Sequence, residues 1–276
     1  MPELPEVENI LQSLEKAVLG KKILRVEILR QDSFLNNKKL QNIKGGSITA
    51  INRRGKWLIM QLDNGYSLLF HLGMTGRLTL LKQGSQPPKY ALLSFFLKGG
   101  KNLIFSDMRR FGRFEKLATS EVIDFKALKS LGAEPFTKDF DISLLAAILG
   151  KSKRQIKDFL LDQGRIAGIG NIYSCEILFD SKISPFKPAD KLTAEEINRL
   201  YQSIHKILSQ AIAEGGSTVK SYVNPAGKRG SFQIRHQVYG REGKTCLLCS
   251  TSIRREKQHG RSTFFCPKCQ PQKNRK

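Results

Sequence analysis

Met1-Pro2-Glu3-Leu4-Pro5-Glu6-Val7-Glu8 opens the chain and places a proline directly behind the initiator methionine, with three carboxylates close by. Trimming of Met1, which a small second residue favours, would leave Pro2 as a terminal secondary amine. An α-amine titrates at about 7.7–8.0, so a useful fraction is an unprotonated nucleophile near neutral pH. Its attack on a carbonyl-like carbon gives a cationic Schiff base, and neighbouring carboxylates can move the protons. The alternative is a frayed, solvated terminus. The octet alone leaves both interpretations open.

The octet runs directly into an apolar repeat. Val7, Ile10, Leu11, Leu14 and Val18 recur at spacings of three and four residues, and Gly20 follows. This spacing predicts an amphipathic helix that ends at a glycine. Such a helix would fix the terminal proline to a rigid body.

The pattern then changes to short strand-like runs separated by turns. Asn64-Gly65 between two of these runs is a strong hairpin signal. Many short strands without intervening helices predict an antiparallel sandwich or barrel. The predicted strands are Ile23–Leu29, Ser47–Asn52, Trp57–Leu62, Ser67–His71, Leu78–Leu81, Ala91–Leu97, Asn102–Phe105 and Arg113–Leu117.

Helical patterns replace the strands from about Ser120. The last helix begins with a capping box, Thr193-x-x-Glu196, and continues with an apolar face. The sequence is therefore α+β, with a strand-rich first part and a helical second part. The predicted helices are Ser143–Leu149, Lys153–Asp162, Asn171–Asp180 and Ala194–Ala213.

The charge balance indicates the chemical class of the binding partner. The 276 residues include 47 Lys plus Arg against 24 Asp plus Glu, which gives +23 and a pI near 10.0. Such an excess indicates a polyanion, either nucleic acid or an anionic membrane. No apolar run approaches the roughly 18 residues of a spanning helix. No basic amphipathic helix stands out, which favours nucleic acid and a cytoplasmic location.

Cysteine spacing predicts a metal site. Cys246, Cys249, Cys266 and Cys269 follow the pattern C-x2-C-x16-C-x2-C, within the range of four-thiolate zinc sites. Two disulfides are the alternative, but cytosolic thiols stay reduced. Because all four positions are cysteine, no coordination position is open to activate water, and one structural Zn²⁺ is expected. Cys175 is left over and is expected to be a small buried residue.

Several loops carry side chains suited to nucleic acid. His71–Arg77 places Met74 between two glycines, and Ser106–Arg113 places three arginines around Phe111. Arginine suits phosphates or base edges, and an exposed aromatic suits stacking or wedging. The alternative is that Met74 and Phe111 are core residues at strand ends. Lys56, after a glycine turn, could hold a phosphate or could be an ordinary solvated lysine.

Further candidates lie in the second half. The Asp162–Asn171 turn contains three glycines just before a helix start, where free N–H groups favour phosphate. Residues 215–230 form a polar, glycine-bounded loop that is either a lid or a linker. From Arg241 to Lys276 the net charge is +8, which suits non-specific phosphate attraction. His259–Phe265 predicts a tight hairpin with Arg261 near its tip, and 270–276 resembles a disordered tail.

Together these pieces resemble the formamidopyrimidine-DNA glycosylase family, bacterial repair enzymes for oxidised purines. The resemblance runs from Pro2 to Cys269 and lies in the combination of motifs. The motifs that carry it, in chain order, are Met1–Glu8, His71–Met74, Arg109–Gly112, Gly168–Tyr173 and the four-cysteine finger.

The resemblance implies a domain order. It implies an N-terminal helix and β-sandwich over 1–120, a helix–two-turn–helix domain with a lesion-covering loop over 121–230, and a β-hairpin zinc finger over 231–276. It also implies double-stranded DNA bound between the two halves, a monomer, and a bacterial, nucleoid-associated location.

The resemblance also implies roles for individual residues. Pro2 matches the nucleophile, Glu3 the proton donor that opens the sugar ring, and Glu6 the carboxylate that holds the terminus. Matches to phosphate-gripping residues are Lys56, Asn171 and Arg261. Matches to other DNA contacts are His71 near the lesion, Met74, Arg109 and Phe111 filling the gap left by the flipped nucleotide, and Tyr222 within the Ser217–Gly230 loop over the extruded base.

The implied reaction is removal of 8-oxoguanine and formamidopyrimidines, followed by strand nicking through β,δ-elimination from a Schiff base on Pro2. One alternative is an endonuclease VIII-like relative for oxidised pyrimidines, which Leu4-Pro5 and the Met74, Arg109 and Phe111 set argue against. Another is a non-catalytic zinc-finger DNA-binding protein, which leaves Pro2, Glu3 and Glu6 unexplained. RNA or ribosome binding rests on charge alone.

Overall fold

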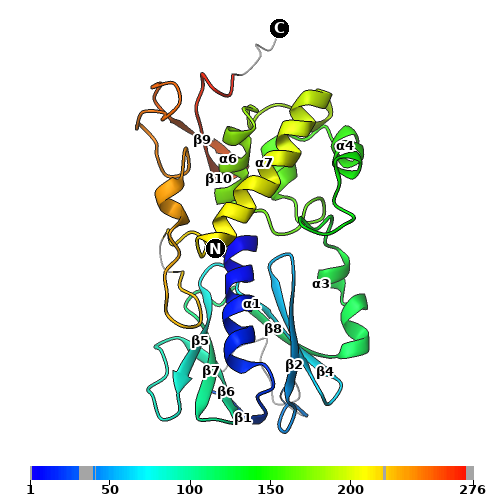
Figure 1. The fold of residues 1–276 in the computed structure, drawn as a ribbon, viewed down its shortest axis with the longest axis vertical. Coiled ribbons are helices and arrows are strands. Elements are labelled where there is room, and N and C mark those ends of the chain that lie inside the picture. Colours follow the sequence, from blue (N-terminus) through cyan, green and yellow to red (C-terminus); the bar gives the residue numbers. More distant parts are fainter. Residues whose placement is uncertain (1, 31–39, 41, 220–221, 272–276) are drawn as a thin grey trace. The chain divides into compact units, whose positions relative to one another are not determined.

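The computed structural model describes residues 2–30, 40, 42–219 and 222–271. Met1, Lys220, Ser221 and the tail beyond Pro271 lie outside these residues. The chain forms two compact units: the first is Met1–Lys129 with Glu214–Ser231, and the second is Ser130–Ala213 with Phe232–Lys276. Figure 1 shows their helices and strands. None of the described helices combines the length and apolar character needed to cross a membrane.

The first unit contains two four-stranded antiparallel sheets. One has the strand order β1-β6-β7-β5 and the other β2-β3-β4-β8. Antiparallel neighbours need only short turns, which agrees with the closely spaced runs in the sequence. The strands are β1 (Ile23–Ile28), β2 (Ile48–Arg54), β3 (Trp57–Leu62), β4 (Tyr66–His71), β5 (Gly76–Lys82), β6 (Ala91–Leu97), β7 (Lys101–Asp107) and β8 (Arg113–Ala118).

An aromatic cluster joins the two sheets into a sandwich. Phe70 on β4 lies 5.8 Å, centroid to centroid, from both Phe95 on β6 and Phe105 on β7, and 5.2 Å from Phe114 on β8. All four rings are fully buried in one apolar core. Such offset and edge-on contacts add about 0.5–1.5 kcal/mol per pair beyond area burial. The sandwich predicted for the first part of the chain is confirmed.

Helix α1 (Leu4–Val18) packs its apolar stripe into the same core and lies against β2 and β3. Pro5 occupies the first turn, where a missing N–H costs no hydrogen bond. The helix stops before Gly20, whose φ of +73° suits glycine. The helix predicted from the apolar spacing is therefore present, and it holds Pro2 and Glu3 at a buried end.

Segment 214–231 belongs to the first unit, whereas the sequence division grouped it with the helical domain. The reason is a set of long-range hydrogen bonds. Ser217 donates to the Glu6 carboxylate, the Leu80 N–H donates to the Pro225 carbonyl, and Ser231 closes the segment by donating to the Glu214 carbonyl. The first unit also holds a 3-10 turn, η1 (Thr119–Asp124), and the short helix α3 (Lys126–Lys129).

The second unit is mainly helical. Its longest helix, α7, is yellow in Figure 1 and begins at the predicted capping box, in which Thr193 and Glu196 exchange hydrogen bonds. Cys175 on α6 is buried, as expected. The helices are α4 (Ile142–Gly150), α5 (Ile156–Leu161), α6 (Asn171–Asp180) and α7 (Ala194–Ala213), with 3-10 turns η2 (Ala189–Lys191) and η3 (Phe232–Arg235).

Helix α5 is shorter than the predicted Lys153–Asp162. The N–H of Ile156 donates to the Lys187 carbonyl at 2.8 Å, and Gln155 forms a bridge with Pro188. These tertiary bonds accompany an extended backbone at Gln155 and use the Ile156 N–H, a donor that a longer helix would need. The finger adds the predicted hairpin, β9 (Arg254–Gln258) and β10 (Arg261–Phe265), with Arg261 at the start of β10.

Candidate active site and metal centre

The carboxylate of Glu6 joins two parts of the first unit, the start of the chain and the segment at Ser217. One oxygen accepts the Glu3 N–H at 2.8 Å and the other accepts the Ser217 N–H at 2.7 Å. Glu6 is 1% exposed and Glu3 is 2% exposed. Charge-assisted bonds to a desolvated carboxylate are stronger than neutral ones. Glu6 therefore fixes the backbone directly after Pro2 and the start of the 217–230 loop with a single group.

Gly216 is required beside Glu6. Its φ is +82°, and a Cβ at this position would lie 2.7 Å from the Glu6 Oε1 atom. Gly230 closes the other side, because a Cβ there would meet the Gly216 carbonyl oxygen at 2.1 Å. The two glycines thus let the ends of the loop approach the Glu6 carboxylate closely.

Tyr222 is directed toward the base of the loop. Its hydroxyl donates to the Glu6 carbonyl at 3.1 Å, and its ring packs against the apolar core. Burial, and then the Glu6 charge, raises the pKa of the Tyr222 phenol. In this conformation Tyr222 anchors the loop as a neutral hydrogen-bond donor.

Lys56 lies in the turn between β2 and β3, and His71 is the last residue of the neighbouring strand β4. His71 pairs with Trp57 across β3 and β4, and their ring centroids are 5.1 Å apart. The Gly73 N–H donates to His71 Nδ1 at 3.3 Å. Burial, followed by the nearby Lys56 and Arg113 charges, lowers the pKa of His71 to about 4. His71 is therefore a neutral imidazole whose Nε2–H is a donor, beside a lysine that is itself buried.

Asp107 organises the arginine-rich loop, a role that the sequence did not reveal. Its Oδ2 accepts the Gly112 N–H at 2.6 Å, and its Oδ1 accepts the Arg109 N–H at 3.1 Å and the Thr75 hydroxyl. Asp107 is 2% exposed. One carboxylate thus sets the shape of residues 107–112 and links this loop to the His71–Arg77 loop.

The two loops also touch backbone to backbone. A Cβ at Gly73 would lie 2.6 Å from the Phe111 carbonyl, so only glycine fits this contact. The side chains themselves point into solvent: Met74 is 42% exposed and Phe111 is 53% exposed. The interpretation that they are core residues is therefore excluded. The Arg109 guanidinium lies 4.7 Å from the Phe111 ring centroid, which keeps a cation beside the exposed aromatic.

In the second unit, two helices hold the turn end of the finger hairpin. The Ser262 carbonyl accepts from Asn171 Nδ2 at 3.0 Å and from Lys157 Nζ at 3.2 Å. Lys157 also donates to Thr263 Oγ1 at 2.9 Å. These bonds bring Asn171, at the N-terminus of α6, beside the residue that follows Arg261. Arg261 itself is exposed.

Lys157 is a second residue that sequence reasoning missed. It is fully buried, and a buried ammonium needs hydrogen-bond partners to offset its desolvation. The available signal was its position between the apolar residues Ile156 and Phe159.

In the glycine turn, the N–H groups of Gly164 and Gly168 donate to side chains of the same turn, Asp162 and Gln163. These two donors are used to shape the turn.

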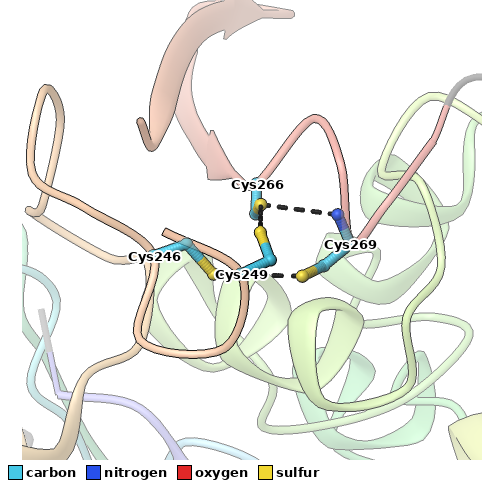
Figure 2. Close-up of side chains that lie close together, drawn as sticks. All are labelled: Cys246, Cys249, Cys266 and Cys269. Atoms are coloured by element: carbon cyan, nitrogen blue, oxygen red, sulfur yellow. Dashed lines mark hydrogen bonds between the residues drawn. The ribbon is translucent and has the colours of Figure 1, made fainter. Parts of the chain in front are cut away.

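The four finger cysteines converge on one point, as Figure 2 shows. Their sulfur atoms all lie within 4.8 Å of one another, with 3.9 Å between Cys246 and Cys269 and 3.4 Å between Cys249 and Cys266. A disulfide would need about 2.05 Å. Four thiolates at 2.3 Å from a tetrahedral metal lie about 3.8 Å apart. The residues therefore fit a structural metal and leave no coordination position for water.

Glu176 attaches the finger to α6. Its carboxylate accepts the N–H groups of Gln237, Val238 and Tyr239 at 2.8, 3.1 and 2.8 Å. The metal-binding module is thus fixed on the helix that starts at Asn171.

Comparisons with known proteins agree with this geometry. Family models match in three places: the formamidopyrimidine-DNA glycosylase N-terminal domain over residues 1–114, the formamidopyrimidine-DNA glycosylase H2TH domain over 131–223, and the zinc finger found in FPG and IleRS over 243–272. The formamidopyrimidine-DNA glycosylase of Listeria innocua is 39% identical over 274 residues, covering 98% of this chain and all of the relative.

Solved structures of Lactococcus lactis Fpg are similar over the same extent. Complexes with DNA containing an abasic site, Fapy-dG (in a mutant of that enzyme) or an oxidized pyrimidine have TM-scores of 0.92, 0.92 and 0.91. Each is 37% identical and covers 98% of this chain and 100% of the other. Fold and site thus define a DNA-binding glycosylase of DNA repair with a zinc-finger module. The chain belongs to the formamidopyrimidine-DNA glycosylase family.

Proposed function

We propose that this protein excises oxidised purines, namely 8-oxoguanine and formamidopyrimidines, from duplex DNA and then nicks the abasic site. The observation that carries the proposal is the Glu6 carboxylate. It holds the residue after Pro2 at 2.8 Å and the 217–230 loop at 2.7 Å. A frayed terminus would have no such restraint. The complex of Lactococcus lactis Fpg with Fapy-dG DNA supports the purine assignment.

The chemistry follows from the terminal amine. After removal of Met1, the Pro2 nitrogen attacks the sugar carbon that bears the damaged base. The bond from that carbon to the base breaks, and the base leaves with the proton that the amine loses. Glu3 protonates the ring oxygen as the ring C–O bond breaks and the sugar opens to the iminium. The resulting iminium acidifies the neighbouring sugar hydrogens, so both phosphates can leave by β- and δ-elimination. The base must first be rotated out of the duplex, at a cost of a few kcal/mol.

The exposed side chains are suited to contact the duplex around the extruded nucleotide. Met74, Arg109 and Phe111 would fill the gap left by the extruded nucleotide. Lys56, Asn171 and Arg261 would grip phosphates, and the His71 donor would lie near the lesion. The 217–230 loop would cover the extruded base, with Tyr222 as its anchor.

We also infer that the finger metal is Zn²⁺, because four thiolates select zinc over harder cations. Its charge would hold the Cys246, Cys249, Cys266 and Cys269 sulfurs as thiolates and fix the hairpin that presents Arg261. The proposal includes a monomer that acts on the bacterial nucleoid, in line with the +23 charge.

Borohydride trapping tests the amine mechanism. Protein shown by intact mass to begin at Pro2 is incubated with a duplex containing 8-oxoguanine opposite cytosine, or with an oxidised-pyrimidine duplex. A covalent adduct that maps to Pro2 and forms mainly with the first duplex is the expected result. A preparation that retains one residue before Pro2 is the matched control, and it should bind damage without forming the adduct.

Other outcomes would favour the alternatives. Preferential trapping with the second duplex would indicate an endonuclease VIII-like specificity, and the complex of Lactococcus lactis Fpg with oxidized-pyrimidine DNA is the observation that keeps this candidate open. If neither duplex gives an adduct with zinc-loaded protein that begins at Pro2, the catalytic proposal is wrong and a binding-only role is supported.

A further inference from the structure

A lysine-lined pocket lies in the first unit at the end of α1 remote from Pro2. Its volume is about 240 Å³, and four of its lining residues are lysines: Lys16, Lys21, Lys98 and Lys101. All four are exposed. Among the described residues that line the pocket, none is Asp or Glu. The pocket therefore concentrates four positive charges without a compensating carboxylate in its wall.

Three separate segments bring these lysines together. Lys16 is in the last turn of α1, Lys21 is in the α1–β1 connection, and Lys98 and Lys101 flank the β6–β7 turn. The Lys98 N–H donates to the Lys22 carbonyl at 2.8 Å, which fixes the turn against the connection. The Lys21 Nζ atom lies 3.8 Å from the position that a Cβ on Gly99 would occupy. The tertiary fold thus holds the cationic segments side by side.

The arrangement is unfavourable for the protein alone. Lys101 on β7 lies directly opposite Lys82 on β5, and like charges in that position destabilise a sheet. The dipole at the C-terminus of α1 can stabilise Lys16, but its effect fades within one turn of the helix. It therefore does not account for the lysines of the β6–β7 turn. A bound anion would relieve the repulsion among them.

The pocket is electrically separate from the proposed catalytic end. Helix α1 has 15 residues, so its ends are about 20 Å apart, whereas charges are screened within about 8–10 Å at physiological salt. We propose that the lysine pocket is a second phosphate-binding site, which holds the backbone of a DNA segment other than the one engaged at Pro2. Phosphodiesters suit it because lysine binds phosphate as a point charge, and because the family already binds DNA.

Substitution of the four lysines tests the site. The variant K16Q/K21Q/K98Q/K101Q is compared with K126Q/K138Q/K182Q/K191Q, which removes four exposed lysines outside the pocket and causes the same change in net charge. Equal thermal midpoints would establish that both variants fold. The wild type and both variants are saturated with a short abasic-analogue duplex and then titrated with a labelled undamaged duplex.

The second duplex is expected to bind the saturated wild type and the control variant, and to bind the pocket variant at least 10-fold more weakly. The slope of log K against log salt should fall by about 2 to 4 in the pocket variant, since each lost phosphate contact contributes about 0.9. Equal weakening in both variants, or in neither, would overturn the proposal. Because the titrant is undamaged, this result does not depend on excision or on the Pro2 amine.

A phosphate titration identifies the source of the anion. Pyrophosphate should shift the amide resonances of Gly99 and Gly100 in the wild type, and the undamaged duplex should shift the same resonances and compete with it. Shifts with pyrophosphate but none with DNA would overturn the backbone assignment and indicate a site for a small phosphate ligand. No shift with either would overturn the site itself.

Discussion

The carboxylate of Glu6 accepts the backbone N–H of Ser217 at 2.7 Å, although 211 residues separate the two in sequence. The other carboxylate oxygen holds the Glu3 N–H. The proposed nucleophilic terminus and the loop proposed to cover the base therefore share one buried anion. Loop position and terminus position are consequently coupled through a single side chain.

Glu6→Gln should weaken both attachments. Glutamine offers one carbonyl oxygen, so its NH₂ group would face one of the two N–H donors and leave a buried donor unsatisfied. We expect a loss of about 1–3 kcal/mol in the free energy of unfolding, measured by urea denaturation, and slower single-turnover excision. Glu15→Gln, on the exposed part of α1, is the control and should change neither. Wild-type stability and excision in Glu6→Gln would contradict the shared role.

Gly216→Ala should disturb the same place sterically. Gly216 and Gly227 have the same φ of +82°, but a Cβ at Gly216 would lie 2.7 Å from Glu6 Oε1, whereas a Cβ at Gly227 would meet nothing within 4 Å. Gly227→Ala should therefore cost only the left-handed backbone penalty of about 1–2 kcal/mol. Gly216→Ala should cost more and should also reduce trapping at Pro2. Thermal unfolding and borohydride trapping of both variants measure the difference; equal costs would mean that the clash is relieved elsewhere.

Asp107→Asn should loosen the arginine-rich loop. Asparagine keeps the size of the side chain, but its NH₂ group would oppose one of the donors that now bind the carboxylate. We expect binding to an abasic-analogue duplex to weaken by about tenfold, or about 1.4 kcal/mol, with little change for undamaged DNA. Asp124→Asn, an exposed aspartate paired with Lys129, is the control. Equal loss on both duplexes would show that Asp107 serves general stability alone.

His71 should make the protein acid-sensitive. Its folded pKa of about 4 lies below its unfolded value near 6.5, so the unfolded state binds the proton first as the pH falls. Stability should therefore decrease between pH 6.5 and 4 and level off below. In His71→Asn, where the amide oxygen can still accept from Gly73, the loss between pH 7 and 4.5 should be about 1–2 kcal/mol smaller. If the free energy of unfolding changed with pH in the same way in both proteins, the lowered pKa of His71 would be contradicted.

Metal removal should unfold the finger hairpin and leave the remainder of the protein folded. Chelation or Cys249→Ser should abolish cooperative folding of the hairpin and remove Arg261 from its position, because four-cysteine sites supply much of the folding free energy of such modules. Affinity for duplex DNA, measured by fluorescence anisotropy, should fall by more than tenfold. Cys175→Ala, outside the four-sulfur cluster, is the control and should keep stoichiometric metal. Full affinity in the metal-free protein would exclude a role for the finger in binding.

Local patterns were sufficient for elements with strong boundaries. Helix α7 starts at its capping box, and β3 and β4 flank the Asn64-Gly65 turn, because these signals depend on neighbouring residues alone. Helix α5 begins later than its pattern predicts, because residues 185–187 accept its first N–H groups. That competition is tertiary and leaves no trace in the local sequence.

The types of residue at the candidate site were predictable from the sequence. The residues that hold them in position, such as Lys157 and Asp107, were not. Spacing alone was enough to predict a metal site at the four cysteines, whereas the roles proposed for Pro2 and Glu3 depend on the resemblance of the whole set of motifs to the family. Lys157 was missed because lysine is mostly exposed, and its burial is understood once its bonds to Ser262 and Thr263 are seen in the structure. Asp107 was missed because its donors come from two loops. Positioning residues of this kind become visible only when distant segments are placed together.

The contact of Gly73 with the backbone of Phe111 has a consequence for how this enzyme family can diversify. Since the two loops pack main chain against main chain, an insertion or deletion in either one would displace the exposed side chain carried by the other. The positions of the exposed Met74 and Phe111 side chains therefore depend on each other, and the two loops are expected to change together. Grafting of either loop onto a relative should keep both exposed side chains in place only when the two segments are transferred together, along with Asp107, which joins them.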